Sequence, residues 1–163
     1  MSFIRFTNMK KYIAIFLFAV IALTSCSKKD SFDPAAQAAA DDVTIKAYLA
    51  AHPNINAIKD VSGLYYQVIT QGTGGYANAS STITANYVGT YLDGTVFDQT
   101  KTNAFTFKLS GVIQGWQIGI PLVQAGGRIL LIVPSGLAYG NSDNTGIPPN
   151  SVLIFTIDVL TVK

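Results

Sequence analysis

The chain has 163 residues, a length that suits one domain with a terminal extension, and its 49% hydrophobic and 11% aromatic content excludes a wholly disordered protein. All nine acids are Asp, and only eight of the eleven basic residues follow Cys26, so the chain beyond this cysteine is near neutral. A nucleic-acid-binding protein needs a basic surface, so we set nucleic acid aside as a partner.

The N-terminal segment, residues 1–25, is predicted to be a lipoprotein signal peptide. Two lysines precede a twelve-residue apolar run, Tyr12 to Leu23. This run is shorter than the about 20 residues that span a bilayer but fits the apolar part of a signal peptide, with a buried core helix as the alternative. The ending LTSC resembles a bacterial lipobox. We therefore expect lipidation at Cys26 and a location at the bacterial cell envelope, with the outer membrane favoured.

Residues 26–61 are predicted to form a polar tether and an N-terminal helix. Asp33 before Pro34 is a helix start signal, and Pro53 is a stop signal. Three apolar side chains share one face at helical spacing: Ile45, Tyr48 and Leu49. This helix either packs on the domain or spaces it from the membrane. It could also be a dimerisation arm, but we favour a spacer and a monomeric protein.

Cysteine and histidine chemistry is not expected. Cys26 and His52 are the only residues of their types, and both precede the predicted domain. One cysteine cannot form an intramolecular disulfide, and a zinc cluster or a Cys-His nucleophile pair would need both of these residues, so we expect no metal and no cofactor. His52 stands directly before Pro53 and is expected to be solvent-exposed at the end of the helix.

From Ser62 onward most apolar stretches follow a period of two, which is typical of strands, and residues 127–134 form a nearly continuous apolar run. Gly-rich turns separate five such stretches: 62–70, 81–92, 104–109, 127–134 and 151–162. A further extended run follows the turn at Asp93. We therefore assign residues 62–163 to one domain.

One segment of this domain, residues 112–123, has a helical rather than a strand pattern. Ile113, Trp116, Gln117 and Ile120 follow the spacing i, i+3, i+4 and i+7, which predicts a short helix ending near Pro121. One face of a sheet must be covered by another element. The predicted fold is therefore α+β: a curved antiparallel sheet of about five strands wrapped around one short helix, preceded by the N-terminal helix.

The predicted domain has more large apolar residues near its turns and on its short helix than a well-filled core requires. Trp116 lies on the short helix, Phe97 and Tyr139 lie beside turns, and Phe155 lies on the last strand. A sheet that cups the helix would make Trp116 the floor of an aromatic pocket for a small apolar ligand or side chain. A plain hydrophobic core with surface tyrosines is the alternative. Asp98 lies directly beside Phe97, and unlike Asp93 it is not accounted for by a position in a surface turn.

Four motifs, YVGTYLDGTVFDQT, GVIQGWQIGI, GGRILLIVPSGLAYG and GIPPNSVLIFTIDVL, together resemble the FKBP-type peptidyl-prolyl cis-trans isomerases over about Leu64 to Val162. The resemblance implies the same curved sheet and helix, rotation about Xaa-Pro bonds, proline-containing polypeptide clients and, in many members, macrolide binding. The catalytic residues that it implies are Asp98, Tyr139, Trp116, Phe97 and Phe155. The substrate-binding residues that it implies are Tyr87, Phe105, Val112, Ile113 and Ile147.

The sequence departs from the family pattern at two places on the pocket rim. Many members carry an Arg shortly after the Phe-Asp pair, where this chain offers only Lys101. The loop YGNSDNTGIPP has Gly146 where some members place Ile. We therefore expect changes in macrolide affinity and in the preferred residue before proline. The favoured function is a lipid-anchored isomerase that assists protein folding in the envelope; a non-catalytic chaperone that binds proline segments and a structural lipoprotein with only the fold stay open.

Overall fold

The computed structural model describes residues 32–143 and 146–163. The predicted signal peptide, the lipidation site Cys26 and nearly all of the predicted tether lie outside these residues. Residues 33–163 form one compact unit. In the described part of the chain, no helix has the length and apolar character needed to cross a membrane.

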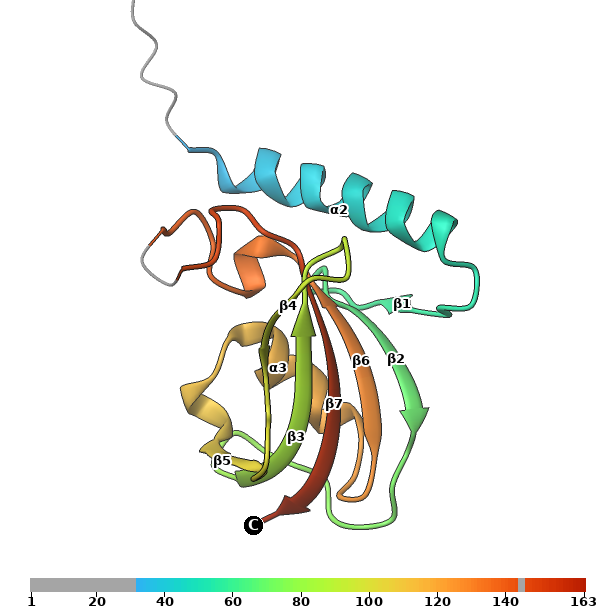
Figure 1. Ribbon diagram of the computed structural model, residues 1–163, viewed down its shortest axis with the longest axis vertical. Coiled ribbons are helices and arrows are strands. Elements are labelled where there is room, and N and C mark those ends of the chain that lie inside the picture. The colour runs from blue at the N-terminus through green and yellow to red at the C-terminus, as the bar shows by residue number, and fades with distance from the viewer. Residues whose placement is uncertain (1–31, 144–145) are drawn as a thin grey trace, which may run out of the picture. The chain divides into compact units, whose positions relative to one another are not determined.

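Seven strands among the described residues form one antiparallel sheet that curves around α3 (Figure 1). They are β1 (Ile58–Lys59), β2 (Tyr65–Thr70), β3 (Thr82–Thr90), β4 (Val96–Gln99), β5 (Phe105–Lys108), β6 (Arg128–Val133) and β7 (Leu153–Val162). The strand order is β1-β2-β6-β7-β3-β4, and β5 pairs with β3. The predicted fold class is confirmed. The two-residue strand β1 was not predicted, because so short a stretch carries no alternation.

The helix inside the sheet is α3 (Gln114–Gly119), which continues into a 3₁₀ turn, η2 (Ile120–Leu122), and so ends near Pro121 as predicted. Trp116 and Ile120 are buried. Two glycines let the helix lie directly against β6. A Cβ atom would come 2.5 Å from Val133 Cγ1 at Gly115 and 2.5 Å from Leu131 Cδ2 at Gly119, so larger residues would push the helix off the sheet.

The predicted N-terminal helix is α2 (Pro34–Ala51), and its start signal acts as expected. The Asp33 carboxylate accepts the N–H groups of Ala35 at 2.9 Å and Ala36 at 3.2 Å, which otherwise have no partner at a helix start. Fully buried Ile45 anchors a second apolar cluster with Tyr65 of β2, Ile132 of β6, Ile154 of β7 and Val152, which directly precedes β7. Tyr48 and Leu49 pack against this cluster.

This second cluster places α2 on the face of the sheet opposite α3. Ile132 and Ile154 alternate with Leu131 and Phe155, which belong to the core around α3, and successive side chains of a strand point to opposite faces. The sequence left open whether α2 packs on the domain or spaces it from the membrane, and the structure shows that it packs on the sheet. Its role as a spacer or dimerisation arm stays a prediction.

His52 is half-buried at the end of α2, so the expectation of a solvent-exposed residue was wrong. Its ring stacks on Tyr48 with centroids 4.0 Å apart, and Nδ1 lies 2.8 Å from the Tyr48 carbonyl oxygen. A histidine in the last turn of a helix can reach back to a carbonyl that has lost its helical partner. This contact folds the ring over the helix instead of leaving it in solvent.

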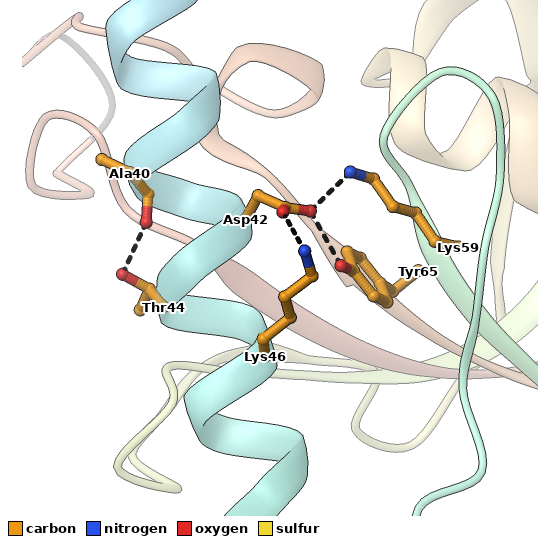
Figure 2. Close-up of polar contacts among 6 residues, drawn as sticks. All are labelled: Ala40, Asp42, Thr44, Lys46, Lys59 and Tyr65. Carbon is orange, nitrogen blue, oxygen red and sulfur yellow. Dashed lines mark hydrogen bonds and ion pairs between the residues drawn. The ribbon is translucent and has the colours of Figure 1, made fainter.

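Asp42 ties α2 to the first two strands (Figure 2). Its carboxylate forms ion pairs with Lys46, one helical turn ahead, and with Lys59 on β1. The Tyr65 hydroxyl on β2 donates to it at 2.8 Å. The Lys46, Lys59 and Tyr65 hydrogen bonds hold the pKa of Asp42 far below its ordinary range. Burial and then the Asp42 contact raise the pKa of Tyr65 to about 12, so the phenol keeps its proton.

The lowered pKa of Asp42 predicts a loss of stability in acid. The folded carboxylate binds protons less readily than the unfolded one, whose ordinary pKa is 3.8, so its contribution is present above this pH and is lost as the pH falls. We expect the free energy of unfolding, measured by urea titration between about pH 6 and pH 3, to fall less steeply in Asp42→Asn than in the wild type. Equal slopes would contradict the assignment; Asp60 and Asp93, whose pKa values are also lowered, supply the remaining slope in both proteins.

Candidate functional site

A cavity of about 300 Å³ opens between α3 and the concave side of the sheet. It is lined by Tyr87, Asp98, Phe105, Gly111, Val112, Ile113, Trp116, Tyr139 and Phe155. These residues come from β3, β4, β5, β7, α3, the segment directly before α3 and, for Tyr139, the segment that follows β6. The fold therefore gathers at one place side chains that are far apart in the sequence.

Trp116 forms the floor of this cavity and is only 4% exposed. Its ring meets Tyr87 and Phe155 edge-on, with centroids 5.0 and 5.2 Å apart, and lies 5.4 Å from the Phe107 ring. Edge-to-face packing of this kind is favourable for aromatic rings. Its indole N–H is buried and has no hydrogen-bond partner within the described residues. Contacts with other rings, and not a hydrogen bond, therefore hold the indole in place.

The polar side of the cavity consists of one carboxylate and two phenols. The Tyr87 hydroxyl donates to Asp98 Oδ2 at 2.6 Å. Burial, followed by this hydrogen bond, strongly raises the pKa of Tyr87, and burial followed by the Asp98 charge raises the pKa of Tyr139. Both phenols therefore stay protonated at neutral pH. The Tyr139 hydroxyl makes no hydrogen bond within the described residues, so its proton is available to a ligand.

Gly89 allows two rings to close over β3. It pairs with Asp98 on β4 and with Phe155 on β7. A Cβ atom here would come 2.7 Å from Phe97 Cζ and 3.0 Å from Phe155 Cε1. The Phe97 and Phe155 rings, 5.6 Å apart and nearly perpendicular, occupy the space that a side chain would need.

A second cavity, of about 230 Å³, adjoins the first. It is lined by Phe97, Asp98, Tyr139, Gly146 and Ile147, so Asp98 and Tyr139 border both cavities. Every residue of the predicted catalytic and substrate-binding set lines one of the two. Phe97 and Ile147 belong to the second cavity only. The role of each residue in catalysis or binding stays a prediction.

Gly111 lines the first cavity and was not predicted. It has no side chain and exposes only backbone, so neither periodicity nor residue chemistry could point to it.

The sequence lacks the Arg that many family members carry shortly after the Phe-Asp pair, and the structure shows no cation paired with Asp98 within the described residues. Lys101, which this chain offers instead, is exposed. Within these same residues, no three His, Cys, Asp or Glu side chains are grouped to hold a metal ion.

Comparisons with known proteins agree with this geometry. The family model described as FKBP-type peptidyl-prolyl cis-trans isomerase matches residues 74–160. The chain is 44% identical over 104 residues to the FKBP-type peptidyl-prolyl cis-trans isomerase FkpA of Escherichia coli K12, covering 63% of this chain and 38% of that protein. It is 45% identical over 105 residues to the Outer membrane protein MIP of Legionella longbeachae, covering 63% of this chain and 45% of that protein.

The chain thus spans less than half the length of these two curated relatives. The crystal structure of FkpA from Escherichia coli superposes with a TM-score of 0.69 at 32% sequence identity, covering 99% of this chain and 75% of that one. The family model takes in most of the sheet and both glycines of α3, and it includes every residue of the two cavities. The chain belongs to the FKBP-type peptidyl-prolyl cis-trans isomerase family.

Proposed function

We propose that this chain is a peptidyl-prolyl cis-trans isomerase that rotates Xaa-Pro bonds in polypeptide clients and so assists their folding. The observation that carries the proposal is the aromatic cavity floored by Trp116, with Asp98 and Tyr139 on its polar side. The cavity is large enough for a proline ring and its flanking amide, and its walls are mainly apolar. Membership of the isomerase family supports the same activity.

The reaction needs no proton transfer and no covalent intermediate. Rotation about an amide has a barrier of about 18–20 kcal/mol, so uncatalysed Xaa-Pro exchange takes tens of seconds or longer. The twisted amide loses resonance, and its carbonyl is less polar than that of the planar form. An apolar pocket therefore tolerates the twisted form better than the planar one, and fixed dipoles favour the twist further.

Each element of the cavity has a role in this scheme. The proline ring would lie on the Trp116 indole, between the edges of Tyr87 and Phe155, which hold that indole. The Tyr139 hydroxyl would donate to a ligand carbonyl. Asp98 holds the Tyr87 hydroxyl at 2.6 Å and is a fixed dipole partner instead of a general base, because isomerisation moves no proton. Each tenfold acceleration requires a barrier about 1.4 kcal/mol lower.

A protease-free isomerisation assay on an Xaa-Pro peptide series tests the proposal, using soluble protein without residues 1–26. We expect the wild type to accelerate exchange and the double variant Trp116→Ala/Asp98→Val to lose this acceleration. An unchanged rate in the double variant would show that the site is elsewhere. Peptide binding without any rate enhancement in the wild type would instead select the non-catalytic chaperone, and neither binding nor catalysis would select the structural lipoprotein.

We also propose that the protein acts as a monomer at the bacterial cell envelope, anchored by lipid on Cys26 and placed at the outer membrane. The lipobox-like LTSC supports the anchor, and the Legionella relative is named as an outer membrane protein. Mass spectrometry of the mature chain should find acyl groups on Cys26. An unmodified Cys26 in the membrane fraction would rule out the anchor.

Macrolides are proposed as inhibitors. The missing Arg and the presence of Gly146 at the pocket rim are expected to alter their affinity.

A further inference from the structure

A carboxylate on α2 is buried against the segment that carries Tyr139. Asp41 is 3% exposed and Ser135, the first residue of the 3₁₀ turn η3 (Ser135–Leu137), is 1% exposed. The backbone N–H and the hydroxyl of Ser135 both donate to Asp41 Oδ2, at 2.8 and 2.7 Å. The Gln37 side chain donates to Oδ1 at 2.7 Å. In Figure 1, this turn lies beneath the N-terminal half of α2.

Ser135 in turn fixes both neighbours of Tyr139. The Ser135 carbonyl accepts the N–H of Ala138 at 3.0 Å and the N–H of Gly140 at 2.8 Å. The Gly140 carbonyl accepts the N–H of Asn150 at 2.8 Å, which ties the segment to the residues before β7. The residues on each side of Tyr139 are therefore both hydrogen-bonded to Ser135, the residue that Asp41 holds.

The Asp41 contact is directional, unlike the apolar packing of α2. Ile45 and its cluster attach the helix to the sheet through apolar packing, which is non-directional. A buried carboxylate is costly unless each oxygen is hydrogen-bonded, and here three donors meet the two oxygens in one geometry. These three hydrogen bonds link a fixed point of α2 to the first residue of η3. The contact therefore defines a position, which general apolar packing does not.

We propose that Asp41 is a positioning residue of the isomerase site, which sets the Tyr139 hydroxyl at the cavity by fixing Ser135. The proposal rests on the proposed isomerase function and extends the site to α2, outside the residues that the family model matches. A displacement of the hydroxyl by about 1 Å is enough to lower catalysis strongly. Loss of the Asp41 carboxylate should therefore lower turnover without any change in the residues that touch the substrate.

The test compares kcat and KM of full-length Asp41→Ala, Asp41→Asn and Ser135→Ala with the wild type, at a temperature where circular dichroism shows each protein to be folded. We expect Asp41→Ala to lower kcat/KM by about tenfold, mainly through kcat. Asp41→Asn keeps an acceptor for Ser135 and, with the Gln37 amide turned over, satisfies all three contacts, so it should retain most of the activity. Ser135→Ala keeps the N–H contact and should fall between the two.

Asp42→Asn is the matched control, because it is the neighbouring carboxylate and holds α2 to β1 and β2 instead of to η3 (Figure 2). It should lower the melting temperature and leave kcat/KM unchanged. A second readout is the pair Tyr139→Phe and Tyr139→Phe/Asp41→Ala. If Asp41 acts through the Tyr139 hydroxyl, the Asp41 substitution should lower kcat/KM by much less than tenfold once that hydroxyl is absent.

The outcomes separate this inference from the proposed function. An inactive wild type would refute the isomerase proposal itself. An active wild type with fully active, folded Asp41→Ala would refute the positioning role, and so would an equal fold-loss from Asp41→Ala with and without the Tyr139 hydroxyl. If Asp41→Ala does not fold, the test uses Asp41→Asn and Ser135→Ala instead. An unchanged kcat/KM in Ser135→Ala overturns the positioning role. A kcat/KM that is lower in Ser135→Ala than in Asp41→Asn, with both losses absent in the Tyr139→Phe background, supports it.

Discussion

Replacing Asp98 by valine is expected to lower kcat/KM for an Xaa-Pro peptide by about 10- to 100-fold while leaving the free energy of unfolding nearly unchanged. The carboxylate is exposed and forms no ion pair within the described residues, so the fold loses little. The cavity loses its one negative charge and the acceptor of the Tyr87 hydroxyl. Protease-free kinetics and urea unfolding of the same preparation measure both quantities.

Two companion variants separate the roles that remain open for Asp98. Asp98→Asn keeps an acceptor for Tyr87 but removes the charge, whereas Tyr87→Phe keeps the charge and removes the hydroxyl. If Asp98 acts on the prolyl amide through its charge, Asp98→Asn should be as poor as Asp98→Val, and Tyr87→Phe should stay active. If Asp98 only orients Tyr87, Asp98→Asn should stay active and Tyr87→Phe should be as poor as Asp98→Val. Wild-type kcat/KM in Asp98→Val would remove this residue from the site.

Trp116→Ala is expected to cause the largest loss of stability among the site residues, about 3–5 kcal/mol. The indole is 4% exposed and contacts the rings of Tyr87, Phe107 and Phe155, so its removal leaves a void between α3 and the sheet. In the fraction that stays folded, kcat/KM should fall by about tenfold or more, because the floor under the proline ring is absent.

Trp116→Phe is the control for size. Because the indole N–H has no partner within the described residues, this variant breaks no hydrogen bond and removes only volume. It should lose about 1–2 kcal/mol and keep measurable isomerase activity. Urea titrations of both variants against the wild type provide the comparison. Equal stability of Trp116→Ala and the wild type would mean that the ring is not part of the core.

The elements that repeat a pattern over several residues could be predicted from the sequence. The alternation along β3 and β7 and the helical spacing around Trp116 each involve many residues that must share one buried face. The capping of α2 by Asp33 was predictable for another reason, since its contacts are local. The pocket residues depended on the family motifs, because periodicity alone did not distinguish a pocket from a core.

The missed features depend on contacts between segments far apart in the chain. The bonds of Asp41 to Ser135 join α2 to a turn that follows β6, and nothing near either residue indicates the other. The same holds for Tyr87 and Asp98: the acid was singled out, but its hydroxyl partner is set by the register of β3 and β4. His52 was misplaced because its burial depends on ring stacking within the helix end.

The strand order has a consequence for how the molecule folds. Strand β7 lies between β6 and β3, so without residues 153–162 no strand pairing joins β1, β2 and β6 to β3 and its partners β4 and β5. Tyr87, Asp98 and Phe105 lie on β3, β4 and β5, Tyr139 follows β6, and Phe155 lies on β7 itself. Pairings between such distant segments form late and slowly. Because β7 joins the two sets of strands and supplies Phe155, we expect ligand binding measured during refolding to appear only once β7 has paired.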